Sequence, residues 1–128
     1  MSKHETWRTR QYWESVGGLL IEEFLAIKAN TKNNVRKRLI DGVIVLGEKT
    51  DKQSGGTHDL TDKEIIVVQT KAKPLGMYLM GQALFSREIM KRFNPKSIKT
   101  VAICSKTDSE LEKICSKYDI DVIEIPED

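Results

Sequence analysis

The chain has 128 residues, of which 39% are hydrophobic and 31% charged, a composition typical of one globular domain rather than of a disordered chain. No apolar run approaches the roughly 20 residues that a membrane span requires, and the N-terminus lacks the apolar segment of a signal peptide. We therefore expect a cytoplasmic protein that has no membrane partner. Residues 108–128 carry a net charge of −6 and the others +8, which is compatible with a polyanionic partner.

The first half of the chain contains one predicted helix and two predicted strands. Apolar residues recur at helical spacing between Trp7 and Ala29, which predicts a long amphipathic helix. Residues 38–46 are rich in β-branched side chains and predict a strand. The polar stretch 47–58 contains two adjacent glycines and predicts a flexible loop. Residues 64–71 predict a second strand, and its continuous apolar run indicates a central position in the sheet.

The second half alternates between helices and strands. Helical spacing predicts a helix over residues 77–93 and a shorter one over 108–118, which Thr107 or Asp108 would cap. Residues 97–104 and 121–126 predict two more strands. The order α-β-β-α-β-α-β indicates a single domain, residues 1–128, with a mixed four-stranded sheet flanked by helices. Two cysteines without a metal-binding spacing predict free, buried thiols.

Three polar residues stand at chemically informative positions in the two central strands. Asp41 interrupts an apolar strand, while Gln69 and Lys71 lie two residues apart and therefore point to the same face at the end of the next strand. Carboxylate and amide oxygens suit Mg²⁺ or Mn²⁺, and a nearby ammonium can orient water or hold a phosphate. These are the parts that phosphodiester hydrolysis requires. The alternative is that Asp41 is exposed at a bulge and that the other two side chains merely emerge into water.

The segments Leu39–Val45, with Asp41, and Ile66–Lys71, with Gln69 and Lys71, resemble the PD-(D/E)xK nuclease superfamily. Small archaeal Holliday-junction-resolvase-like members are the most similar branch. The resemblance implies a restriction-endonuclease-like α/β fold and a Mg²⁺- or Mn²⁺-dependent DNA endonuclease. It covers most of the chain by element order, but the motif itself is short. Gln69 stands where the family usually has an acid, although some members carry Gln-x-Lys.

The resemblance also implies an acidic residue on the first helix near the metal. On a helical wheel Glu23 lies at the edge of the apolar stripe and Glu22 lies opposite it, which favours Glu23. Counting from Gly18 by the Gly-x-x-x-Glu pattern of related resolvases instead favours Glu22. The expected metal ligands are Asp41, Gln69, Glu23 and the main-chain carbonyl of Thr70, with Lys71 assisting the attacking water.

A second set of residues is expected to bind nucleic acid. Gln82 lies on the helix after the motif, where members of the superfamily often carry a glutamine that contacts substrate. Basic residues flank both central strands and would make binding dependent on salt. The expected contacts are Gln82, Lys73, Arg87, Lys91, Arg36 and Arg38.

The sequence thus predicts an endonuclease acting on DNA, with RNA left open as a substrate. A small chain without a sequence-reading domain favours recognition of branched or structured DNA, and we expect a homodimer. Gln69 supports a second hypothesis, a nucleic-acid-binding module of the same fold that lacks catalysis. A third is an unrelated α/β domain that recognises protein.

Overall fold

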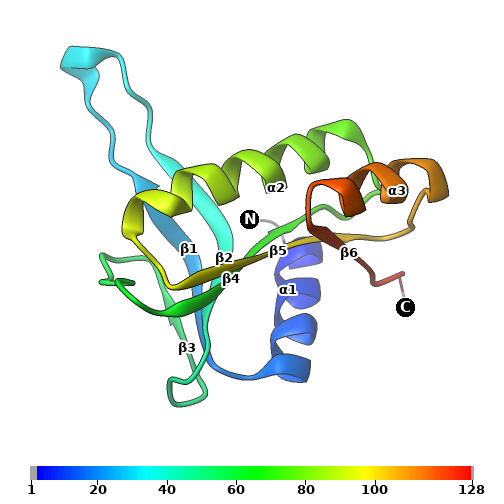
Figure 1. Cartoon of the computed structure of the whole chain (residues 1–128), viewed down its shortest axis with the longest axis horizontal. Helices are drawn as coiled ribbons and strands as arrows, with labels where there is room; N and C mark the ends of the chain where they lie inside the picture. Colours follow the sequence, from blue (N-terminus) through cyan, green and yellow to red (C-terminus); the bar gives the residue numbers. More distant parts are fainter. Residues whose placement is uncertain (1–2, 128) are drawn as a thin grey trace.

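A mixed six-stranded sheet forms the centre of the protein, as seen in the computed structural model, which describes residues 3–127 and side chains from residue 5 onward (Figure 1). The strands lie in the order β3-β1-β2-β4-β5-β6. Strand β2 is antiparallel to both β1 and β4, whereas the pairs β1–β3, β4–β5 and β5–β6 are parallel. The strand bounds are β1 (Leu19–Ile27), β2 (Arg38–Val45), β3 (Asp51–Ser54), β4 (Glu64–Thr70), β5 (Ser97–Cys104) and β6 (Ile120–Glu124).

Helices cover both faces of this sheet. Helix α1 (Lys3–Val16) packs on one face, while α2 (Met77–Met90) and α3 (Ser109–Lys117) lie on the other (Figure 1). Short 3₁₀ turns occupy Thr31–Asn33 and Lys91–Phe93. Among the described residues, no helix has both the length and the apolar character needed to cross a membrane.

Strand β4 shows why the sheet is sandwiched between helices. Its side chains alternate between two buried clusters: Ile65 and Val67 pack with Met90 of α2, whereas Ile66 and Val68 pack with Tyr12 of α1. A strand buried on both faces reads as a continuous apolar run. The central position predicted for this strand is therefore confirmed, and the same alternation directs the side chain of Gln69 toward α2.

The predicted helix from Trp7 to Ala29 is wrong beyond Val16. Gly17 and Gly18 adopt φ values of 76° and 84°, which favour glycine and end the helix. A Cβ on Gly18 would lie 2.7 Å from the carbonyl oxygen of Val45, so glycine is required on steric grounds as well. The apolar residues after this turn form β1, and its residues Leu20 and Ile21 face opposite sides of the sheet.

The predicted loop over residues 47–58 contains the short strand β3, which pairs in parallel with β1. All four of its residues are polar and exposed, so its sequence lacks the alternation of apolar and polar residues that predicts a strand. These two strands raise the number from the predicted four to six. The remaining strands and helices lie close to their predicted bounds, except that α2 ends at Met90 and residues 91–93 form a 3₁₀ turn. Asp108 caps α3 by accepting from the amides of Glu110 and Leu111, and both cysteines are free and buried, which confirms those predictions.

Candidate functional site

Asp41 lies where strands β2 and β4 separate. Their ladder ends at the pair Gly42–Val68. Beyond that pair, the Thr70 amide donates to Asp41 Oδ2 at 2.9 Å instead of to a main-chain carbonyl. The Asp41 side chain thus accepts a hydrogen bond that a main-chain carbonyl of β2 would accept in a regular ladder. Its carboxylate lies in the gap between the two strands. Asp41 is partly buried rather than exposed, which answers the alternative of a solvent-exposed aspartate at a bulge.

The main chain of Thr70 faces the same gap. Its amide points toward β2, while the next amide, of Lys71, donates to Ile103 of β5. Because the N–H and C=O groups of one residue lie on the same side of a strand, the Thr70 carbonyl also points toward β2 and Asp41. Its hydroxyl is hydrogen-bonded at 2.7 Å to that of Thr9, which fixes α1 over the end of β4. Gly42 permits this close approach, since a Cβ there would lie 3.1 Å from the Thr9 methyl group.

The carboxylate of Asp41 is in an environment that disfavours its charge. Burial raises its pKa from the ordinary value of 3.8 to about 6, against the opposing effect of the hydrogen bond from Thr70. The negative charges of Glu5 and Glu23 raise this pKa further. A carboxylate that is short of water and close to other acids favours a bound cation, and such perturbed groups are common at functional sites.

Glu23 lies beside Asp41, but on a strand rather than on a helix. It lies between the pairs Glu22–Gly42 and Phe24–Ile40, which places it opposite Asp41. Its φ of 51° is unusual for a residue other than glycine inside a strand, and such backbone strain tends to be retained at functional positions.

Glu22, the alternative ligand, faces α1 and has a different partner. Its two carboxylate oxygens accept from Arg10 at 2.9 and 3.0 Å. Glu23 is therefore the acid that lies near Asp41, as predicted, but the prediction that it lies on a helix is wrong because both acids belong to β1.

Gln69 is buried and held by α2. Its Nε2 donates to Ser86 Oγ at 2.7 Å, and only 4% of the residue is exposed. The nitrogen end of the amide is thereby engaged with the helix, so the oxygen is the end that a metal would use. Gln69 and Thr70 point to opposite faces of β4, as the pleat requires.

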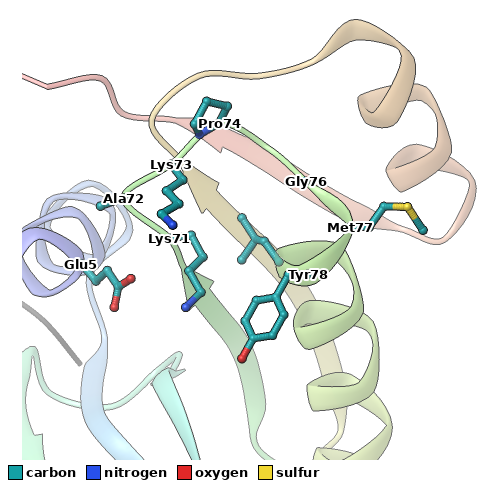
Figure 2. Close-up of a pocket in the computed structure, with 9 residues that line it drawn as sticks. Glu5, Lys71, Ala72, Lys73, Pro74, Gly76, Met77 and Tyr78 are labelled. Atoms are coloured by element: carbon teal, nitrogen blue, oxygen red, sulfur yellow. The ribbon is translucent and has the colours of Figure 1, made fainter.

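Lys71 lies at the edge of a cavity of about 630 Å³ between the first turns of α1 and α2. Figure 2 shows its side chain extending between Glu5 and Tyr78. Its ammonium lies 4.8 Å from the centre of the Tyr78 ring, an attractive cation–π arrangement. Glu5 lines this cavity, and its negative charge also raises the pKa of Asp41. Glu5 therefore lies near both Lys71 and the gap between β2 and β4.

Helix α2 contributes three residues along the side that faces β4. Tyr78, Gln82 and Ser86 follow at intervals of four and so lie above one another. Tyr78 contacts Lys71 and Ser86 contacts Gln69, which places the predicted residue Gln82 between them.

Glu5 and Thr9 were missed by the sequence analysis. The first helix was predicted to begin at Trp7, and Glu5 was therefore not considered as the helical acid. The available signal was the spacing of four between Glu5 and Thr9, which puts both on the face of α1 that docks on β4.

The predicted basic contacts fall into three separate places. Lys73 lines the cavity beside Lys71. Arg36 lies in the exposed connection between β1 and β2, and Arg38 is the exposed first residue of β2. Arg87 and Lys91 lie near Ser97, at the amino end of β5, which is the end of the sheet opposite to Lys71.

The donors around Asp41 suit Mg²⁺ in chemical type. Mg²⁺ commonly binds one or two carboxylates and completes its shell with water and substrate phosphate. Asp41, Glu23, the Thr70 carbonyl and the Gln69 amide oxygen provide oxygen donors of this kind. Within residues 3–127 no cluster of three His, Cys, Asp or Glu side chains forms a metal cage, so part of the coordination would come from the neutral oxygens.

Comparisons of the chain with protein-family models, with curated proteins and with solved structures found no match.

Proposed function

We propose that this protein is a Mg²⁺- or Mn²⁺-dependent DNA endonuclease with a restriction-endonuclease-like fold. The observation that carries the proposal is the placement of Asp41. Its partly buried carboxylate occupies the gap where β2 and β4 separate, with Glu5 and Glu23 close enough to raise its pKa and the Thr70 carbonyl facing it. A purely structural role does not call for so many acidic and oxygen groups around one desolvated carboxylate.

Each residue has a distinct role in this proposal. Asp41, Glu23, Gln69 and the Thr70 carbonyl hold the ion, and Glu5 adds negative charge from α1. When bound, Mg²⁺ lowers the pKa of water and neutralises charge that develops on the phosphate. Lys71 holds a phosphate oxygen or orients the attacking water, and Tyr78 limits where its ammonium can lie. Gln82 contacts the substrate from α2.

The connection between β1 and β2, together with the first residue of β2, is the surface we assign to the DNA backbone. Residues 28–38 contain five basic residues and no acidic residue, and all eleven are exposed. Figure 1 shows this connection extending away from the sheet and the helices. Such an arm would contact phosphates without reading bases, which suits recognition of branched or structured DNA by shape. The five residues are Lys28, Lys32, Arg36, Lys37 and Arg38.

A homodimer is the assembly that we propose, because a pair of identical active sites can cut two strands of one branched substrate together.

A second candidate function is a DNA-binding module of the same fold without catalysis. The hydrogen bond from Gln69 to Ser86 favours it, since it gives the glutamine a structural role that an ionised acid would not fill in the same way. This module would keep the basic arm but would not bind Mn²⁺ measurably.

The test is incubation with Mg²⁺ or Mn²⁺ and a panel of linear, nicked, flapped and four-way DNA substrates. The matched variant is Asp41→Asn, which keeps an oxygen acceptor for the Thr70 amide and removes the charge. We expect metal-dependent cleavage of a branched substrate that this variant loses. Salt-dependent binding of DNA without cleavage and without Mn²⁺ binding would support the module instead. Absence of binding and of cleavage would exclude both.

A further inference from the structure

We propose that the cavity beside Lys71 receives an unpaired nucleobase of the DNA substrate, which stacks on Tyr78. This inference rests on the proposed function and adds to it a substrate class, DNA with an unpaired nucleotide next to the bond that is cut. The cavity, of about 630 Å³, falls within the range of about 300–1,000 Å³ that is usual for small-ligand sites.

The lining of the cavity combines the features that a nucleotide requires. Met77, Leu79 and Pro74 supply apolar surface, and Tyr78 supplies an aromatic ring (Figure 2). Lys71 and Lys73 line the same space and provide positive charge for a flanking phosphate. Sites for single-stranded DNA likewise pair basic residues that follow the backbone with aromatic rings that stack on bases.

Tyr78 is unusually accessible for a large aromatic residue at the edge of a cavity. It is 69% exposed, and its neighbour Met77 is 79% exposed. The ring is nevertheless held in place at 4.8 Å from the Lys71 ammonium. Lys71 lies over one face of the ring, so a base would stack on the other face, while the lysine stays within reach of a phosphate.

Base pairing within a duplex limits which DNA substrates can place a base in this cavity. The faces of bases within a duplex are stacked on their neighbours, so a base can reach a protein pocket only when it is unpaired or flipped out. The cavity therefore favours flaps, branch points and single strands over continuous duplex.

The experiment measures binding in buffer with EDTA, so that neither metal nor cleavage is required. Fluorescence anisotropy compares a labelled single strand, a flapped duplex and a blunt duplex for three variants. Tyr78→Ala removes the ring and Tyr78→Phe keeps it. Phe85→Ala is the matched control, because Phe85 lies on the same helix, is 65% exposed and does not line the cavity. Circular dichroism and thermal unfolding establish that each variant is folded.

We expect Tyr78→Ala to weaken binding of the single strand and of the flapped duplex about tenfold, the scale of one lost base–aromatic stack. Binding of the blunt duplex should be unchanged, and Tyr78→Phe and Phe85→Ala should bind all three as the wild type does. An equal loss on all three substrates, or no loss relative to Phe85→Ala, would overturn the inference while leaving the endonuclease proposal intact. Absence of DNA binding by the wild type would overturn both.

Discussion

Charged residues lie at both ends of strand β4, but their exposure to water and their partners differ. At the amino end, the charges are exposed and paired: Lys63 contacts Glu48 at 2.7 Å, and Lys91 contacts Glu88 at 2.8 Å on the neighbouring end of α2. At the carboxyl end, the partly buried Asp41 accepts a hydrogen bond from a backbone amide, and other acids raise its pKa.

This difference distinguishes ordinary charged surface at the amino end from a candidate functional site at the carboxyl end. Exposed ion pairs contribute little to stability and are common on any protein surface. A carboxylate held away from water beside other negative charges opposes folding unless a cation or a proton compensates it. The carboxyl end of β4 is therefore the end at which substitutions should affect chemistry more than folding.

The largest expected effect is the loss of cleavage in Lys71→Ala. Removing the ammonium should lower the cleavage rate about a hundredfold or more, which is the range for a lost group that assists proton transfer or holds the reacting phosphate. DNA affinity should change by only about twofold, because the basic arm contributes most phosphate contacts. Single-turnover cleavage and anisotropy measure the two quantities separately. Lys117→Ala, an exposed lysine on α3, is the control, and equal losses in both variants would contradict the assignment.

The second prediction concerns the stability of Asp41→Asn as a function of pH, without divalent ions. The pKa of Asp41 is about 6 in the folded chain and its ordinary value is 3.8, so the folded state holds the proton more tightly. The wild type should accordingly lose about 2–3 kcal/mol of stability as pH rises from about 4 to about 6, and Asp41→Asn should not. Urea unfolding at pH values from 4 to 7 measures this difference. A difference between the two proteins that does not change with pH would show that Asp41 is not desolvated.

The third prediction compares basic residues in two of the three places that the fold separates. Replacing Arg36, Lys37 and Arg38 with alanine should weaken DNA binding and lower the slope of log affinity against log salt by about 2–3. Replacing Arg87 and Lys91 should change the slope less, since Arg87 donates to the Tyr118 carbonyl and both side chains contact Glu88. Binding is measured in an Asp41→Asn background to prevent cleavage, and equal slopes for the two sets would remove the distinction.

The strands that carry the motif were predictable, because β-branched apolar runs bounded by polar residues have few other interpretations. Asp41 stood out because it interrupts such a run, and Gln69 and Lys71 because they lie at the end of one. The start of the chain was misread because Leu19–Ile27 contains apolar residues at both strand and helix spacing, and only Gly17 and Gly18 mark the break. Since the boundary of α1 was wrong, Glu5 was missed. The hydrogen bond between Gln69 and Ser86 joins residues 17 apart, and local periodicity does not indicate it.

The smallest expected effect, and the sharpest distinction between an enzyme and a binding module, comes from Gln69→Glu. The new carboxylate would add negative charge beside Asp41, so the metal concentration for half-maximal cleavage should fall several-fold. Ser86 can donate its hydroxyl proton to the new acid, so the contact between β4 and α2 is retained. Titration of cleavage against Mn²⁺ measures the shift, and Gln82→Glu on α2 provides a control for added charge on the same side of the site. If the wild type is inert and Gln69→Glu cleaves DNA, the native protein is a binding module whose glutamine replaces a catalytic acid. If Gln69→Glu requires more metal than the wild type, the glutamine oxygen does not face the ion, and its role is limited to holding α2 against β4.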